Sequence, residues 1–365
     1  MFQMSLVKHS ILILSAPIGS GHQLAARALE EAFLKYPECK ITQASAFDFF
    51  PKIIGTVFLK SYLLILKFFP ESYAFVYKWG NNPSGSLWLR NIINRLLAQL
   101  AASFLKKVRP DIVIATHATP AGIIDLYKKE HPKIFLASVV TDFTVHKWWL
   151  CDRTNAYFLA AADIKPNVDT KKWQKVFYYG IPVRKEFREE YNRDYVRMKF
   201  GWKKNERVCL LMGGGDGILP MEDLITAVVN NYDATIKFVA ITGRNVGLAR
   251  QLRHLPFDVK VFGFIDSVAE LMNSADYLVT KAGGLTAAEA LTTRVKYIIY
   301  NPLPGQEEAN ASYLESIGAV KIGRTPFEVA RAVREYDRAD NIFLGAMGKP
   351  LAADYIAEAI LREND

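Results

Sequence analysis

The chain has 365 residues, of which 50% are apolar, and a formal net charge of +9. This length exceeds one ordinary core and fits two domains of roughly 150–200 residues each, and the composition excludes wholesale disorder. The three cysteines are far apart and form no CxxC pair, which argues against a disulfide framework or a structural zinc site and indicates a reducing compartment.

Short apolar runs alternate with helical patterns in the first half of the chain. Strands are predicted at Ile11–Ser15, Lys40–Ala46, Asp111–Thr116, Ile134–Val140, Ala156–Leu159 and Val176–Tyr179. Most of these runs are uninterrupted rather than alternating, as is typical of strands covered on both faces. The first run is predicted to be a buried strand rather than part of a signal peptide, because no small-residue cleavage pattern follows it.

The first strand ends in a glycine turn, Pro17-Ile18-Gly19-Ser20-Gly21-His22, and a helix with one apolar face follows. Glycines at a strand-to-helix turn let backbone N–H groups approach an anion at the helix N-terminus. The turn is not a Walker loop, because no Gly-Lys-Ser/Thr follows. Two interpretations of His22 stay open: it acts as a base or binds an acceptor or phosphate, or it merely caps the helix.

Basic and aromatic residues are concentrated between Pro51 and Pro110, where nine basic residues accompany a single acid, Glu71. This mixture is typical of a surface that meets anionic lipid headgroups. The run Ile53–Phe69 has only 17 residues and contains Lys60 and Lys67, so we expect it to lie on a membrane rather than to cross one. The alternative is an amphipathic helix packed on its own domain. Nucleic acid is not expected as a partner, because no RNA- or DNA-binding signature is present.

The second half of the chain repeats the alternation of strands and helices. Strands are predicted at Val208–Met212, Ile236–Thr242, Val259–Phe262, Tyr277–Thr280, Tyr297–Tyr300 and Val320–Ile322. The sequence therefore predicts an α/β fold with two doubly wound, Rossmann-like domains that face a central cleft. We expect the domains at 1–180 and 181–345, joined near Gly180-Ile181-Pro182, and a C-terminal helix at 346–365 that packs back on the first domain.

Two more glycine turns follow strands of the second half. Gly213-Gly214-Gly215-Asp216-Gly217 comes after Val208–Met212, and Lys281-Ala282-Gly283-Gly284-Leu285-Thr286 precedes a helix predicted at Ala287–Leu291. The second of these turns is best placed to bind a diphosphate at a helix N-terminus. Glu289 has two interpretations: it completes a T-x-x-E capping box with Thr286, or its carboxylate binds the two hydroxyls of a ribose.

The segment Thr280–Val320 resembles the nucleotide-sugar half of the family that holds the bacterial diacylglycerol glucosyltransferases and the plant-type monogalactosyldiacylglycerol synthases. The peptidoglycan N-acetylglucosaminyltransferase is a more distant relative. The resemblance extends in family order to LILSAPIGSGHQLAARAL near the start and to Thr141–Leu150, Gly180–Phe187 and Val261–Asp276. The stretch around Pro51–Trp79 is similar in composition to the acceptor and membrane-docking region of that family.

The resemblance implies a GT-B glycosyltransferase, with an acceptor and membrane-docking domain followed by a nucleotide-sugar-binding domain. Phe264 and Ile265 would hold the uracil, and Glu289 the ribose. Gly283, Gly284 and Leu285 would contact the diphosphate, Arg184 would add a positive charge there, and Gln306 and Glu307 would bind the hexose hydroxyls. The other predicted substrate-binding residues, from the two remaining glycine turns, are Gly21, Gly214 and Gly215.

The sequence departs from the plant-type pattern at Pro17, where those enzymes carry an aspartate five residues before the histidine. The general base is therefore expected among His22, Asp142 and His146, the last two in the segment after Ile134–Val140. For Asp142 the alternative is an ordinary N-cap or turn residue.

The expected activity is transfer of glucose or galactose, with inversion, from a UDP-sugar to the free hydroxyl of diacylglycerol. No cofactor or essential metal is expected, because the chain has no D-x-D pair. The expected location is the cytoplasmic face of the cell membrane, with the protein bound peripherally to an anionic surface. Three alternatives stay open: transfer to a polyprenyl-diphosphate sugar, a non-catalytic nucleotide-sugar-binding regulator, and an epimerase, the last disfavoured because a nicotinamide fingerprint is lacking.

Overall fold

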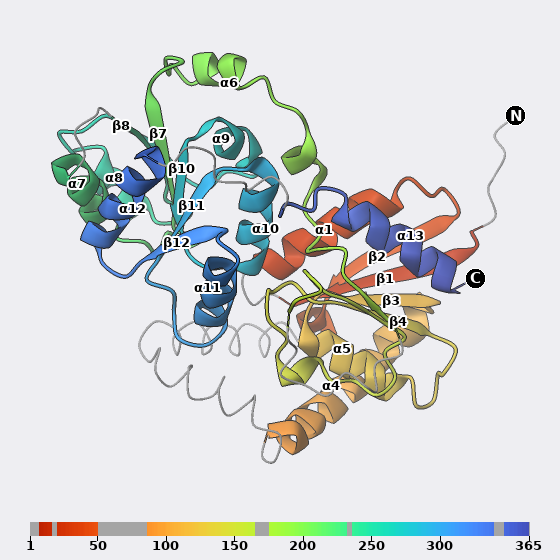
Figure 1. Cartoon of the computed structure of the whole chain (residues 1–365). Helices are drawn as coiled ribbons and strands as arrows, with labels where there is room; N and C mark the ends of the chain where they lie inside the picture. Colours follow the sequence, from red (N-terminus) through yellow and green to blue (C-terminus); the bar gives the residue numbers. More distant parts are fainter. Residues whose placement is uncertain are drawn as a thin grey trace, which may run out of the picture. The chain divides into compact units, whose positions relative to one another are not determined.

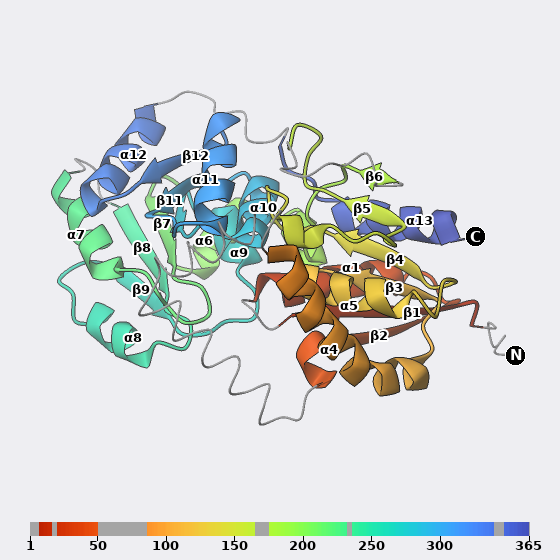
Figure 2. The same cartoon turned by 90° about the horizontal axis from the view of Figure 1, so that it is seen from below.

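A computed structural model describes residues 7–16, 20–49, 86–164, 175–231, 236–338 and 347–364. The chain divides into two compact units, drawn in Figures 1 and 2. The first unit comprises Met1–Arg184, Pro304–Gln306 and Lys349–Asp365, and the second comprises Lys185–Leu303 and Glu307–Gly348. The boundary after Arg184 lies a few residues beyond the Gly180-Ile181-Pro182 segment.

The first unit is built on a six-stranded parallel sheet in the order β2-β1-β3-β4-β5-β6. Its strands are β1 (His9–Ser15), β2 (Cys39–Ser45), β3 (Ile112–Ala115), β4 (Phe135–Val139), β5 (Ala156–Phe158) and β6 (Val176–Phe177). The chain leaves β1 toward β2 on one side and later returns to β3 on the other side. This reversal opens a crevice at the carboxyl ends of β1 and β3, where ligands bind in open α/β sheets.

Helices cover both faces of this sheet (Figure 2). They are α1 (Gly21–Phe33), α4 (Ser86–Val108), α5 (Ala118–Tyr127) and α13 (Ala352–Asn364), with the short 3-10 helices η1 (Ala46–Phe49) and η2 (Lys147–Trp149). The last helix, α13, returns to the first unit and contacts α1. Ile356 and Ile360 of α13 are buried in the same core as Leu29 and Phe33 of α1, so the C-terminal segment completes the core of the first unit.

The second unit repeats this architecture with the order β12-β11-β10-β7-β8-β9. Its strands are β7 (Arg207–Met212), β8 (Ile236–Ile241), β9 (Val259–Phe262), β10 (Tyr277–Thr280), β11 (Lys296–Tyr300) and β12 (Val320–Gly323). Its helices are η4 (Lys185–Arg188), α6 (Arg193–Lys199), α7 (Met221–Asn231), α8 (Val246–Leu252), α9 (Ala269–Ser274), α10 (Gly284–Thr293), α11 (Gln306–Ser316) and α12 (Pro326–Arg338). Here the strand order reverses between β7 and β10, which places the crevice of this unit at their carboxyl ends.

Each of the twelve strands predicted from the sequence is present, with ends that differ by two residues at most. The prediction succeeds because the inner strands of both sheets are buried on both faces and therefore read as continuous apolar runs, whereas the edge strands β2, β6 and β9 are only partly buried. The α/β fold class is confirmed. The run Ile53–Phe69 and the Pro51–Trp79 stretch lie outside the described residues.

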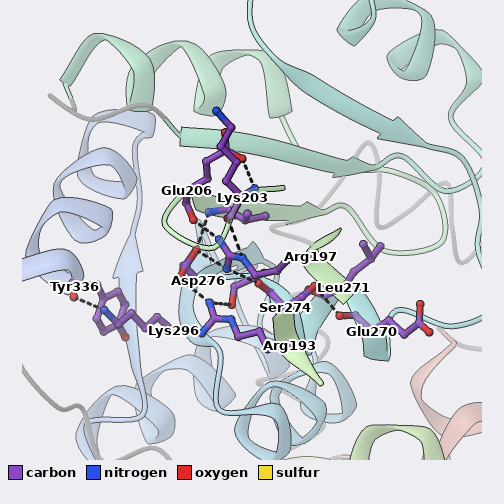
Figure 3. A network of polar contacts seen from close by, with 12 residues as sticks. Arg193, Arg197, Lys203, Glu206, Glu270, Leu271, Ser274, Asp276, Lys296 and Tyr336 are labelled. Atoms are coloured by element: carbon purple, nitrogen blue, oxygen red, sulfur yellow. Dashed lines mark hydrogen bonds and ion pairs between the residues drawn. The ribbon is translucent and has the colours of Figure 1, made fainter. Parts of the chain in front are cut away.

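A network of polar contacts stabilises the second unit at the amino ends of its strands (Figure 3). Arg197 of α6 is 2% exposed, and its guanidinium donates to the backbone oxygens of Ser274, at 3.0 Å, and Glu206. The same group lies 3.4 Å from the carboxylate of Asp276. That carboxylate also accepts from the Val208 backbone N–H at 2.8 Å and from Arg193 at 2.7 Å. One buried cation therefore connects α6, α9 and the starts of β7 and β10.

We expect Arg197→Ala to lower the free energy of unfolding by about 3 kcal/mol, because it leaves several buried acceptors without their donor. Urea unfolding followed by circular dichroism measures this. The matched control is Lys204→Ala, whose ion pair with Asp194 is exposed and whose loss should leave the unfolding midpoint unchanged. Equal effects of the two substitutions would contradict the assignment.

Candidate active site

His22 lies at the crevice of the first unit, in the first turn of α1 after β1. Its ring nitrogen Nδ1 is 2.9 Å from the backbone oxygen of Thr116, which follows β3, and 2.7 Å from Oγ1 of Thr141, which follows β4. The Thr116 hydroxyl donates in turn to the backbone oxygen of His22 at 3.0 Å. Both the ring and the backbone of His22 are thus fixed by neighbouring strands, so the ring does not merely cap its own helix.

These contacts define which nitrogen of His22 is basic. The Thr116 carbonyl only accepts hydrogen bonds, so Nδ1 carries the proton and donates it. Thr141 Oγ1, 3.4 Å from the same carbonyl, completes the arrangement by donating to it. In the neutral ring, Nε2 is then the nitrogen with a lone pair. This is the form in which a histidine removes a proton from a substrate hydroxyl.

Two further histidines lie near His22. The His117 ring stands edge-on to the His22 ring, with centroids 4.7 Å apart and an interplanar angle of 81°. His146 precedes η2, and its Nδ1 accepts from the Trp148 backbone N–H at 3.1 Å. His146 therefore serves as a helix cap, and His22 is the better candidate base.

Asp142 and Gln306 meet in the first unit, which includes Pro304–Gln306. The Gln306 side-chain amide donates to a carboxylate oxygen of Asp142 at 2.7 Å. This contact joins residues that are 164 positions apart in the sequence. Asp142 also lies close enough to His22 to act on its charge, so three of the sequence-predicted site residues belong to one polar cluster.

The surroundings of the two histidines favour their neutral forms. Burial lowers the pKa of His22 below its ordinary 6.5, while the Asp142 carboxylate and the hydrogen bond to Thr116 act in the opposite direction. Burial lowers the pKa of His117 well below 6.5, and the charges of His22 and His146 lower it further. Both rings are therefore neutral near pH 7.

Packing explains part of the Gly213–Gly217 turn in the second unit. Gly217 has φ +63°, and a Cβ at this position would lie 2.2 Å from the backbone oxygen of Thr242. Gly243, after β8, has φ +58° and faces the Gly215 oxygen, to which a Cβ would come within 2.4 Å. The Arg244 backbone N–H donates to the same oxygen at 2.9 Å. The two turns interlock backbone to backbone, which accounts for Gly217 and Gly243 without a ligand. A Cβ at Gly214 would meet nothing, and one at Gly215 only the Arg244 side chain, so binding by these two residues stays a prediction.

The turn before α10 is different. A Cβ on Gly283 would find only Thr286 Oγ1, at 3.8 Å, so the fold does not need glycine there. The preceding carbonyls are held from inside the unit, where Tyr297 Oη donates to the Lys281 oxygen at 2.5 Å and Asn310 to the Ala282 oxygen at 3.1 Å. The N-cap residue Gly283 offers no side-chain cap. The turn is therefore rigid, and the first amides of α10 are available to an anion.

The capping-box interpretation of Glu289 is wrong. Helix α10 begins at Gly284, three residues before the predicted Ala287, so Thr286 lies inside the first turn and is not the N-cap. The local T-x-x-E spacing suggested a later start than the chain adopts, because glycines at 283 and 284 gave no helical signal of their own. The Glu289 side chain is 3% exposed and belongs to the second turn of the helix.

The other predicted residues have mixed surroundings. Glu307 accepts from Lys281 Nζ at 2.9 Å and from the Leu303 backbone N–H at 3.1 Å, so its carboxylate holds the loop before α11. Phe264, beyond the end of β9, exposes 59% of its surface, and Ile265 beside it is half-buried. Arg184 is buried and belongs to the first unit, whereas Gly283, Gly284 and Leu285 belong to the second.

Thr116, His117 and Thr141 contact the His22 ring but were not among the site residues predicted from the sequence. The available signal was position, because all three directly follow apolar runs and so lie at the carboxyl edge of the sheet. Across the part of the chain that the structure describes, no three His, Cys, Asp or Glu side chains form a group suited to a metal ion.

Comparisons with known proteins agree with this geometry. Residues 22–183 match the Monogalactosyldiacylglycerol (MGDG) synthase family, and residues 208–325 match the Glycosyltransferase family 28 C-terminal domain. A processive diacylglycerol beta-glucosyltransferase of Bacillus cereus (strain AH187) is 30% identical over 371 residues, covering 97% of this chain and 94% of that protein.

Solved structures with the same fold are more distant in sequence. MurG of Acinetobacter baumannii superimposes with a TM-score of 0.62 at 16% identity, covering 96% of this chain and 99% of that one. A UDP-GlcNAc 2-epimerase from Neisseria meningitidis gives a TM-score of 0.58 at 15% identity, with coverage of 96% and 99%. The glycotransferase of kitacinnamycin gives a TM-score of 0.64 at 15% identity, so the architecture alone occurs in both a glycotransferase and an epimerase.

The two doubly wound units, with their crevices at the strand-order reversals, define the GT-B architecture, and the family matches make this protein a glycosyltransferase. Within that class, the chain belongs to the family of diacylglycerol glucosyltransferases and monogalactosyldiacylglycerol synthases. The identification from sequence blocks is confirmed.

Substitutions of Gly283 and Gly217 should separate binding from folding. We expect Gly283→Ala to fold as the wild type, because its Cβ meets only an ordinary contact. The added Cβ should keep the diphosphate from the first amides of α10 and weaken UDP binding about tenfold, the scale of one lost hydrogen bond.

We expect Gly217→Ala to lower the free energy of unfolding by more than about 1 kcal/mol, because alanine is strained at this φ. Calorimetric titration with UDP and urea unfolding measure the two effects, and unchanged UDP binding by Gly283→Ala would contradict the first.

Proposed function

We propose that this glycosyltransferase transfers a hexose from a UDP-sugar to the free hydroxyl of diacylglycerol, with inversion at the anomeric carbon. The observation that carries the proposal is the bond from His22 Nδ1 to the Thr116 carbonyl, because it leaves Nε2 as a basic nitrogen at the crevice of the first unit. The diacylglycerol acceptor is supported by the 30% identity to the Bacillus cereus enzyme along nearly the full length of both chains.

In this mechanism, His22 Nε2 takes the proton of the acceptor hydroxyl as its oxygen attacks the anomeric carbon. The bond from that carbon to UDP breaks as the new glycosidic bond forms. General-base help of this kind contributes about 10²–10⁴ in rate. The Asp142 carboxylate supports the step, since it favours the charged form of His22 once the proton has arrived.

The donor would bind to the second unit through the N-terminus of α10. Backbone amides at Gly283, Gly284 and Leu285 would contact the diphosphate, where the helix dipole favours the negative charge of departing UDP. Glu289 would bind the ribose hydroxyls, and Phe264 and Ile265 the uracil. Arg184 would add positive charge at the diphosphate.

The hexose would be recognised by Gln306 and Glu307. Gln306 has an amide that already donates to Asp142, so sugar recognition and the polar cluster around the base share one side chain. Glu307 keeps its loop in place through Lys281. The name of the Bacillus cereus relative favours glucose over galactose.

The acceptor would be reached at a membrane surface through α4. One side of this helix is anchored to the unit by the buried residues Asn94, Ala101 and Leu105. Its other side exposes large apolar side chains at helical spacing, namely Trp88, Ile92, Ile93, Leu96 and Leu100. Exposed Arg95, Lys106 and Lys107 accompany them. Apolar and basic side chains on one helix are the combination that binds anionic lipid.

The exposed apolar and basic side chains of α4 are typical of a helix that lies on a membrane surface. None of the helices in the described ranges is sufficiently long and apolar to traverse a bilayer. We propose peripheral attachment at the cytoplasmic face of the cell membrane, because anionic lipids of that leaflet attract basic side chains such as those of α4.

The transfer assay uses radiolabelled UDP-glucose and UDP-galactose with diacylglycerol in anionic liposomes. We expect wild type to form labelled glycolipid, with UDP-glucose as the better donor. His22→Ala should lower the rate about 10²–10⁴-fold, and Glu289→Ala should raise the KM for the donor. Glu315→Ala, an exposed substitution on α11, is the matched control and should match wild type. Absence of labelled lipid with either donor, despite UDP binding, would overturn the acceptor and direct the assay to polyprenyl-diphosphate sugars or to a binding-only role.

Sedimentation with anionic vesicles tests the membrane surface. We expect Leu96→Glu to weaken vesicle binding about tenfold or more, since it removes a leucine from the apolar stripe and adds a negative charge. Leu34→Glu is the control, because Leu34 is 71% exposed but follows α1 and stands outside the stripe. Equal binding by the two variants would show that α4 does not meet the lipid.

A further inference from the structure

His117, which follows Thr116 in the sequence, also contacts the His22 ring. Thr116 binds His22 twice, through its backbone oxygen to the ring and through its hydroxyl to the backbone. The next residue, His117, places its own imidazole edge-on against that ring at 4.7 Å. The dipeptide Thr116-His117 at the end of β3 therefore encloses His22 on more than one side.

His117 is itself fixed in orientation and protonation. It is the N-cap of α5, with φ −145° and ψ 151°, and its Nδ1 accepts from the Thr119 backbone N–H at 3.1 Å. A nitrogen that accepts a hydrogen bond carries no proton, so the neutral His117 ring has its proton on Nε2. Capping thus locks both the rotation of the ring and its tautomer.

We propose that His117 is a positioning residue for the transfer reaction: its capped imidazole holds the His22 ring at the angle that presents Nε2 to the acceptor hydroxyl. This inference rests on the proposed role of His22 as general base. The capping of α5 does not require contact between the two imidazoles, whereas contact with a fixed ring restricts the orientation of a base that must meet a hydroxyl in one geometry.

The charged groups around the pair give the sign of the pH effect. His22 faces Asp142 from the segment after β4 and His117 from the start of α5, and His117 also faces His146 before η2. Burial, to which the His117 ring contributes, lowers the pKa of His22, and the Asp142 carboxylate raises it. Removing the His117 ring admits water, so the pKa of His22 rises toward its ordinary value.

Two substitutions separate the ring from the cap. Asparagine is among the strongest N-cap residues, so His117→Asn keeps the cap of α5 and loses the ring. Phenylalanine has an aromatic ring but no hydrogen-bond acceptor, so His117→Phe keeps the ring contact with His22 and loses the cap of α5. Thermal unfolding checks that each variant is folded before kinetics are measured.

We expect His117→Asn to lower kcat about 10- to 100-fold, the cost of a misplaced base, with the KM for the UDP-sugar unchanged. The acid limb of the profile of kcat/KM against pH should move upward, toward pH 6.5. His117→Phe should retain more activity than His117→Asn and leave the acid limb in place. Asp142→Asn should move the limb the other way, because it removes the carboxylate that raises the pKa of His22.

Nitrogen-15 spectra of histidine-labelled protein give a readout that does not depend on turnover. In wild type, we expect His117 Nδ1 and His22 Nε2 to be the unprotonated nitrogens at pH 7, and His22 to titrate at higher pH in His117→Asn. A wild-type rate, acid limb and His22 titration in folded His117→Asn, together with an inactive His22→Ala, would overturn the role of His117 alone. Full transfer by His22→Ala would instead overturn the proposed base, and the positioning role with it.

Discussion

The reversal of strand order in each sheet is the constraint on which the rest of this structure depends. In the first unit, the connections that follow β1 and β3 run in opposite directions across the sheet. In the second unit, the connections that follow β7 and β10 do the same. Because every strand is parallel, each of these paths leaves from the same edge of its sheet. His22, Thr116, the Gly213–Gly217 turn and the N-terminus of α10 all follow such strands. The opposite edge carries contacts such as Arg197 with Asp276, which stabilise the unit without taking part in chemistry.

The surroundings of His22 balance two opposed demands that its proposed role as general base makes on the ring. The ring must be neutral before the reaction, and burial provides this by lowering its pKa. It must also tolerate a positive charge once it holds the proton, and the Asp142 carboxylate favours that state. The hydrogen bond from Nδ1 to the Thr116 carbonyl leaves Nε2 as the nitrogen that can accept a proton. The position, orientation and charge of the His22 ring are therefore set by residues at the ends of three strands, β1, β3 and β4.

Glycine has two distinct roles in the second unit, and only the packed structure distinguishes them. At Gly217 and Gly243 the left-handed backbone and the approach of a carbonyl exclude any side chain. At Gly283 the backbone is ordinary and the space beside it is open, so packing does not require glycine there, and a close approach of the proposed diphosphate would. The fold is shared with a glycotransferase and an epimerase, each at 15% identity, so the architecture alone does not determine the chemistry.

The sequence by itself determined the twelve strands, the two parallel sheets and the family, because doubly covered strands are continuous apolar runs and the family blocks are local in sequence. It left open the role of His22 and misplaced the start of α10, where the T-x-x-E spacing suggested a cap at Thr286. Only the tertiary structure decided where α10 begins and which residues the His22 ring contacts. The partners of His22 lie 94 and 119 residues away, and Asp142 meets Gln306 across 164 residues. Such pairs follow from which strands become neighbours, and the apolar pattern of a buried strand is the same whichever neighbour it has.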